Sequence, residues 1–161
     1  MTESIYRPSG EGQAVDIGPS TWLIKAASSE TAGACDIFEG RVGHLEGPPL
    51  HVHKEQMDMF YVVSGRLKVQ VGDKILDLGP GDFAGAPAGV PHTYANVEVE
   101  PAHVINMMAP GGFSDGLIEV GSWPPGPPPE GEELEAFAEK YRLEIVGPPI
   151  PVVLGLVGGP A

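Results

Sequence analysis

Two histidines and an aspartate lie close together in residues 51–58, which read HVHKEQMD. Side chains alternate along a strand, so His51 and His53 project to the same face. Asp58 follows His53 at an odd offset and would point to the opposite face of one unbroken strand. A bend or bulge between them would allow the three side chains to converge.

A third histidine, His92, follows a turn rich in glycine and proline, GDFAGAPAGVP over residues 81–91. Three imidazoles and one carboxylate are a ligand set for a divalent first-row transition metal, with coordination positions left open for substrate. Such a set suits Fe, Mn, Co, Ni or Zn, and the order of affinities does not choose among them. We therefore predict one such ion as the cofactor, at the place where the chemistry occurs.

The spacing of these residues resembles the two sequence motifs of the cupin superfamily. The second motif is matched at every fixed position, by Gly81, Pro87, Gly89, His92 and Asn96. The first motif is matched by His51, His53, Asp58 and Gly65. There are two departures. Asp58 stands where the family usually has glutamate, and Leu45 stands where the motif begins with glycine, although Gly47 is near.

The resemblance implies a fold and a ligand set. The fold would be all-β, the double-stranded β-helix or jelly-roll barrel of the cupins. The metal ligands would be His51, His53, Asp58 and His92. The segments PPLHVH at 48–53, FYVVSG at 60–65 and APGGF at 109–113 are similar to the small single-domain cupins of the quercetin 2,3-dioxygenase-like group.

That group implies a dioxygenase acting on a flavonol-like or other enol-bearing aromatic small molecule, with dioxygen as second substrate. Asp58 would be the catalytic residue that accepts the substrate proton, but a carboxylate beside a cation is a poor base unless it leaves the ion. Asp58 is therefore either a direct ligand or a base beside the ion. Two other hypotheses stay open: an oxygen-independent isomerase, cyclase or lyase with the ion as Lewis acid, and a binding protein without catalysis.

Three residues are candidate walls of a substrate pocket. If Asp58 faces the ion, alternation along the strand 57–64 places Phe60 and Val62 on the same face. Tyr94, which follows His92 closely, is the third candidate. For Phe60, plain core packing is an equal alternative.

Three other potential ligands or nucleophiles lie outside the motifs. His44 and His103 match no motif position, and we predict that neither binds the ion. Cys35 has no recognisable partner base around it, so we predict a packing role for it.

The elements that must position these residues are short strands. We expect them at 21–27, at 34–42, at 51–58 with a bend or bulge before Asp58, and at 57–64, 67–71, 74–78, 83–86 and 102–108, with Gly72 opening a type II′ turn. Many short antiparallel strands indicate a closed barrel or jelly roll. A chain of 161 residues suits one domain. We therefore predict a single cupin domain over residues 1–161, with its barrel core at about 21–112 and an extension at about 113–161.

The C-terminal part predicts one helix, over 130–143, where apolar residues recur at helical spacing as Leu134, Phe137, Ala138 and Tyr141. The prolines at 124–129 predict an extended connector. Residues 1–20 show no periodicity, and the tail 149–157 is apolar. Such extended termini would cover the barrel or a partner subunit, from which we predict a homodimer.

The chain is acidic, with a formal net charge of −13. That charge argues against nucleic acid and anionic membranes as partners, because both are bound through clustered Lys and Arg. No apolar run approaches about 18 residues, as a membrane-spanning helix requires. The first residues lack the pattern of a signal peptide, and a single cysteine forms no internal disulfide. We expect a small-molecule partner, no membrane association and a cytoplasmic location.

Overall fold

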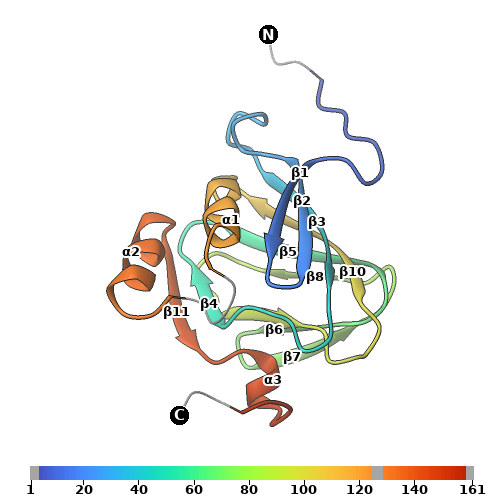
Figure 1. Ribbon diagram of the computed structural model, residues 1–161, viewed down its shortest axis with the longest axis vertical. Helices are drawn as coiled ribbons and strands as arrows, with labels where there is room; N and C mark the ends of the chain where they lie inside the picture. The colour runs from blue at the N-terminus through green and yellow to red at the C-terminus, as the bar shows by residue number, and fades with distance from the viewer. Residues whose placement is uncertain (1–3, 125–128, 159–161) are drawn as a thin grey trace.

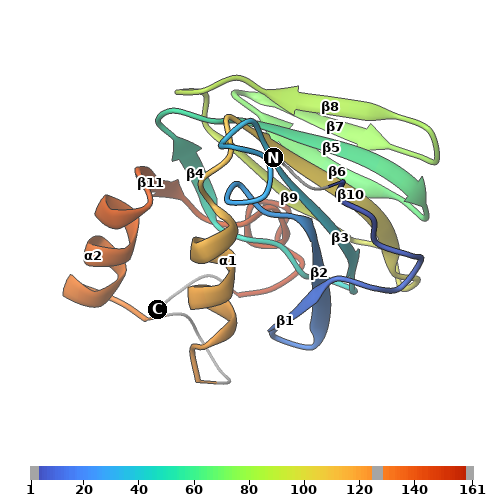
Figure 2. The same cartoon turned by 90° about the horizontal axis from the view of Figure 1, so that it is seen from above.

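Two antiparallel sheets form the main body of the computed structural model, which describes residues 4–124 and 129–158 (Figures 1 and 2). One sheet has six strands in the order β1-β2-β3-β10-β5-β8, and the other has five in the order β11-β4-β9-β6-β7. Neighbouring strands pair antiparallel throughout. The strands are β1 Gln13–Ile17, β2 Ser20–Ala26, β3 Asp36–Val42, β4 Leu50–His53, β5 Met57–Ser64, β6 Leu67–Val71, β7 Lys74–Leu78, β8 Phe83–Ala86, β9 His92–Ala95, β10 Ala102–Ala109 and β11 Leu143–Gly147. The predicted all-β architecture is confirmed.

The core lies between the sheets and is formed by the inward side of each strand. In β10, buried and half-buried residues alternate along the whole strand, as a sheet with one face on the core requires. The same alternation holds in β2 and β3. The largest apolar side chains in this core that are almost fully buried are Phe38, Phe60, Val62, Leu67, Val69, Val104 and Met108.

The strand that carries the two histidines is interrupted before Asp58. β4 ends at His53 and β5 begins at Met57, and the residues between them belong to neither strand. The two strands also lie in different sheets. The predicted bend is therefore confirmed, and it takes the chain from the five-stranded sheet to the six-stranded one.

Two residues in turns, Gly72 and Leu45, have left-handed backbone conformations. Gly72, at the tip of the predicted β6–β7 hairpin, has φ of 57°, a value that glycine adopts without steric cost. Leu45, which stands where the cupin motif begins with glycine, has φ of 61° and so occupies the left-handed conformation. Its backbone N–H donates to the carbonyl of Asn96 at 2.7 Å. The chain therefore makes a left-handed turn at position 45 with leucine, not glycine.

The C-terminal extension contains more helix than the sequence predicted. The expected helix is present as α2, Glu132–Lys140, and it is shorter because Arg142 adopts φ of 57° and Leu143 starts β11. Two further helices were not predicted, α1 at Ser114–Gly121 and the single turn α3 at Ile150–Val153. In both views α1 and α2 lie together on one side of the barrel, away from the β6–β7 hairpin (Figures 1 and 2).

The sheets also reach beyond the predicted barrel core at 21–112. β1 lies in the stretch 1–20, which was expected to be an arm without regular structure, and β11 adds an edge strand beside β4. Most of the predicted proline connector, residues 125–128, lies outside the described residues. No helix among the residues that the structure describes is long and apolar enough to cross a membrane.

Candidate metal centre

Three imidazoles come from neighbouring strands of the five-stranded sheet. His51 and His53 lie on β4 and are both buried, since alternate residues of this strand face the interior. His92 begins β9 and pairs directly with His51 across the two strands. The pairing places the ring centroids of His51 and His92 4.6 Å apart. Strand alternation and register thus bring the three rings to one point.

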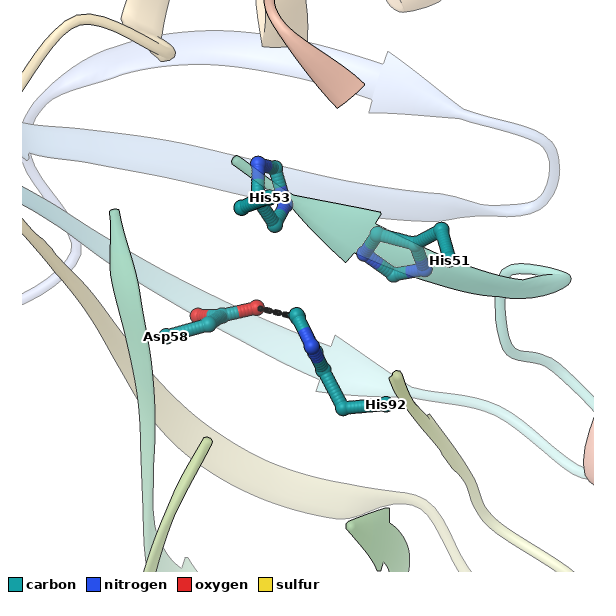
Figure 3. A group of neighbouring side chains, drawn as sticks. All are labelled: His51, His53, Asp58 and His92. Carbon is teal, nitrogen blue, oxygen red and sulfur yellow. Dashed lines mark hydrogen bonds and ion pairs between the residues drawn. The ribbon is translucent and has the colours of Figure 1, made fainter. Parts of the chain in front are cut away.

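Asp58 faces these rings from the other sheet. It is buried on β5, and its Oδ2 lies 3.2 Å from Nε2 of His92 (Figure 3). One potential ligand atom from each of the four residues lies within 4.8 Å of the other three. The structure therefore brings together all four residues that the motifs predict.

Hydrogen bonds to backbone carbonyls orient two of the rings. Nδ1 of His51 lies 2.8 Å from the carbonyl of Pro49, and Nδ1 of His92 lies 2.8 Å from the carbonyl of Val90. A carbonyl only accepts, so Nδ1 carries the hydrogen in both rings and Nε2 is left toward the cluster. This is the arrangement in which an outer partner fixes the tautomer of a metal-binding histidine.

The third ring is less completely partnered. Nδ1 of His53 and Oε1 of Gln56 are both buried, and neither has a hydrogen-bond partner in the described part of the chain. A buried polar atom without a partner is costly. Together with a donor set of three nitrogens and one carboxylate, this orphaned nitrogen fits a centre that is completed by a divalent ion.

The buried environment sets the charge of the rings. Burial, followed by the influence of His92, lowers the pKa of His51 to about 4. Burial, followed by the influence of His51, lowers the pKa of His53 to about 3. For His92, burial also acts to lower the pKa, but the hydrogen bond and charge of Asp58 outweigh it and the net direction is upward. His51 and His53 are thus neutral at pH 7, which is the form that binds metal.

One polar residue of the centre was missed by the sequence analysis. Asn106, on β10, donates from Nδ2 to Oδ1 of Asp58 and also to the carbonyl of Met59 at 3.0 Å. The sequence did contain an indication, because Asn106 is an amide among the apolar residues that β10 turns toward the core. Its partner could not be identified without the register between β10 and β5.

An aromatic residue next to the centre was also missed as a site residue. The ring of Phe113 meets that of His53 edge-on, with centroids 5.1 Å apart. Phe113 also packs against Phe137 and Tyr141 of the C-terminal extension. It therefore connects the candidate centre with the helical side of the molecule.

The three predicted pocket walls lie in the barrel interior. Phe60 and Val62 share the inward face of β5 with Asp58 and are fully buried in the core. Tyr94 packs against Phe60, with ring centroids 5.3 Å apart. Burial, followed by the charges of Asp58 and Glu46, raises the pKa of Tyr94, so its hydroxyl stays protonated. All three are packed as core residues, and a contact with substrate remains a prediction.

The two remaining histidines have partners elsewhere. Nδ1 of His44 lies 2.9 Å from the carbonyl of Glu98. Nε2 of His103 lies 2.8 Å from Oε1 of Glu39. Neither belongs to the cluster of four.

Known proteins resemble parts of this chain in sequence. Residues 39–108 match the family model for the cupin domain. A quercetin 2,3-dioxygenase from Bacillus subtilis (strain 168) is 33% identical over 86 residues, which are 53% of this chain and 26% of that protein. Oxidoreductase OpS7 from Beauveria bassiana (strain ARSEF 2860) is 40% identical over 62 residues, 38% of this chain and 20% of that protein. The chain thus spans about a quarter or less of the curated relatives that it matches.

Solved structures agree on the architecture. KdgF from a Halomonas species superimposes with a TM-score of 0.61 at 21% identity, over 71% of this chain and 99% of that one. An RmlC-like cupin from Shewanella frigidimarina gives a TM-score of 0.59 at 20% identity, over 72% and 99%. At these identities the similarity establishes a shared fold.

Proposed function

We propose that this chain, whose residues 39–108 match the cupin domain, is a metal-dependent enzyme acting on a small molecule at the centre formed by His51, His53, Asp58 and His92. The observation that carries the proposal is the convergence of three imidazoles and one carboxylate, all buried, within 4.8 Å. Buried ionisable groups without an evident structural purpose are typical of functional sites.

The proposed ligands are Nε2 of His51, Nε2 of His92, one nitrogen of His53 and one oxygen of Asp58. A first-row divalent ion bound there would supply Lewis-acid chemistry and, if redox-active, chemistry with dioxygen. His51 and His53 are ready for such an ion at neutral pH, because their lowered pKa values keep both rings unprotonated.

We propose dioxygenation of a flavonol-like or other enol-bearing aromatic compound as the reaction. The support is the similarity to the quercetin 2,3-dioxygenase of Bacillus subtilis, 33% identical over 86 residues, beside the match of residues 39–108, which contain the four candidate ligands, to the cupin domain. Phe60, Val62 and Tyr94 would form the apolar wall against an aromatic ring. The acidic surface plays no part in this recognition.

One observation favours a second candidate function. The carboxylate is that of Asp58, where the family usually has glutamate, and its hydrogen bond from Asn106 opposes the movement that a proton-accepting carboxylate needs. An oxygen-independent isomerase, cyclase or lyase in which the ion polarises a carbonyl while Asp58 stays bound to the ion would not need that movement.

The deciding experiment uses quercetin as probe and protein loaded separately with Fe(II), Ni(II), Mn(II), Co(II) or Zn(II). Each form is mixed with quercetin without oxygen, labelled dioxygen is admitted, and the product mass is measured. Incorporation of label supports the dioxygenase. Turnover that survives without oxygen, and with Zn(II), supports the second function.

The ligand set has its own test. Replacing His51, His53 or His92 by alanine should weaken binding of Zn(II) by more than the roughly 10–100-fold that loss of an outer partner costs. The matched control is His103→Ala, which removes an imidazole bound to Glu39 and should leave Zn(II) binding unchanged. Undiminished metal content in all three ligand variants would contradict the centre.

A further inference from the structure

Asn106 is a polar side chain within an apolar row. The buried, inward-facing residues of β10 are Ala102, Val104, Asn106 and Met108. A buried amide without hydrogen-bond partners destabilises the fold, so this position tolerates Asn106 only through the hydrogen bonds that it makes. Nδ2 makes two, one to Oδ1 of Asp58 and one to the carbonyl of Met59.

The register between β10 and β5 makes the first contact possible. Asn106 lies opposite Phe60, and Met108 lies opposite Asp58, all on the inward side of the six-stranded sheet. Diagonal neighbours on one face of an antiparallel pair are about 7–8 Å apart, which two short polar side chains can span. The amide therefore reaches the carboxylate along the sheet.

The two oxygens of Asp58 consequently have different surroundings. Oδ1 is held by Asn106, whereas Oδ2 lies 3.2 Å from Nε2 of His92. A carboxylate is planar, so a bond that holds Oδ1 toward β10 also sets the direction of Oδ2. Oδ2 is thus the oxygen that lies against His92 of the cluster.

We propose that Asn106 is a positioning residue that presents Asp58 to the metal through Oδ2 alone and keeps this carboxylate from leaving the centre to act as a base. The proposal rests on the proposed function, since it concerns the ligands of the same ion. A carboxylate that accepts a proton from substrate has to turn away from its cation. For Asp58, such a turn would break the bond to Asn106 in a buried site, where an unpaired donor is costly.

The proposal predicts that Asn106 affects metal only through Asp58, which a double-mutant cycle measures. Zn(II) affinity is determined by competition with a chromogenic chelator for the wild type, Asn106→Leu, Asp58→Ala and the double variant. Asn106→Leu should weaken Zn(II) binding about 10–100-fold. In the Asp58→Ala background the same change should alter the affinity by about twofold or less. The visible absorption of the Co(II)-loaded Asn106→Leu protein should also differ from that of the wild type.

A second buried asparagine offers a matched control. Asn96 also donates twice from Nδ2, to the carbonyls of Val42 at 3.0 Å and Glu100 at 2.8 Å. Asn96→Leu should lower the melting temperature and leave Zn(II) affinity unchanged. If Asn106→Leu does not fold, Asn106→Ala, which removes the donor with a smaller side chain, takes its place in the same cycle.

Two results overturn the inference while the metal centre stands: unchanged Zn(II) affinity in Asn106→Leu, or an equal loss with and without Asp58. A wild-type protein that takes up no Zn(II) or Co(II) overturns the inference and the centre together. A wild type that binds metal and shows the expected cycle but turns over nothing overturns the proposed function alone.

Discussion

His51, His53 and His92 share one cluster, yet their surroundings shift their pKa values in opposite directions. The lowered pKa values of His51 and His53 mean that the folded chain resists protonation there, whereas Asp58 raises the pKa of His92. A group with a lowered histidine pKa costs stability as the pH falls, because the unfolded chain takes up a proton that the folded chain refuses. His92 has the opposite sign, and its contribution is lost as the pH rises through its folded pKa.

The first prediction concerns this linkage in chelator-treated protein. Between about pH 4.5 and 6, unfolded His53 is mostly protonated and folded His53, with a pKa of about 3, is not. The free energy of unfolding should therefore rise with pH, and His53→Gln should reduce that slope by about 1.4 kcal/mol per pH unit. Urea unfolding at several pH values measures it. His44→Gln, which changes an exposed ring, is the control, and an equal slope in wild type and His53→Gln would contradict the assignment.

The sequence predicted individual site residues only where a motif fixes their spacing. His51, His53, Asp58 and His92 could be named because their positions repeat a pattern. Asn106 could not, because its contact with Asp58 joins residues separated by 48 positions and depends on strand register.

The helix α1 of the C-terminal extension depends on contacts with the barrel. α1 contains Gly116 and has no side-chain cap of its own, so its local propensity is weak. The N–H of its first residue, Ser114, donates instead to a barrel residue, since Oδ2 of Asp36 accepts from Ser114 and from Gly112 and Phe113 just before the helix. Oδ1 of the same carboxylate accepts from the backbone of Ser28. This carboxylate therefore substitutes for a local cap and positions Phe113 beside His53.

The second prediction is that Asp36→Asn lowers the free energy of unfolding by about 3 kcal/mol, because charged acceptors of backbone N–H groups are worth about 1.5–3 kcal/mol each and an amide replaces one oxygen by a donor. Thermal and urea unfolding measure the loss. The control is Asp16→Asn, an exposed carboxylate that accepts from Thr21 at 2.6 Å and should change stability by about 0.5 kcal/mol or less. Similar losses in both variants would show that Asp36 has no special role.

The third prediction concerns the left-handed turn at Leu45. A side chain in this conformation costs roughly 1–2 kcal/mol, and glycine escapes that cost. Leu45→Gly should therefore be more stable than Leu45→Ala by about 1 kcal/mol, the reverse of the usual order in a folded chain. Urea unfolding of the two variants compares them directly. An alanine variant at least as stable as the glycine variant would contradict the turn geometry.

Strands were easier to predict than helices. In the strands β5 to β8, alternation and turn residues marked both ends, and the predicted bounds agree with the structure. α1 and β1 were missed because neither has a strong local pattern: one is capped from β3 by Asp36, and the other is completed by pairing with β2.

The molecule as a whole combines an acidic chain with an exposed apolar tail. Val153, Leu154, Leu156 and Val157 are 53%, 43%, 49% and 39% exposed after α3 begins. Clustered apolar side chains on a surface are typical of interaction sites. We propose that the tail contributes to a homodimer, as its composition predicted.

The fourth prediction is that the chain sediments at micromolar concentration with twice its mass of 16.8 kDa, and that replacing Val153 and Leu156 together by glutamine shifts it toward the monomer, since the apolar surface that drives association is then polar. Ile75 and Leu76 are each 39% exposed on β7 and supply a matched pair. Glutamine at these two positions should leave the dimer intact. A wild-type monomer would contradict the proposal.

The fold class could be predicted because short strands and turns dominate the chain. The sequence predicted a bend between His53 and Asp58. It did not predict that the chain passes there from one sheet to the other, because strand pairing joins residues that are distant in the sequence. The helical side of the molecule depends on Phe113, Phe137 and Tyr141 packing together, a set that no single stretch contains.

The break between β4 and β5 has a mechanical consequence. Three of the four candidate ligands belong to the five-stranded sheet and only Asp58 belongs to the six-stranded one. A bound ion would therefore connect the two sheets, through three ligands from one sheet and one ligand from the other. A force that pulls the sheets apart would break the single bond between the ion and Asp58 first. The ion would then remain bound to the histidines of β4 and β9 when the barrel opens. Closing the barrel again would then require one bond to form, at the end of a side chain that Asn106 already holds in place.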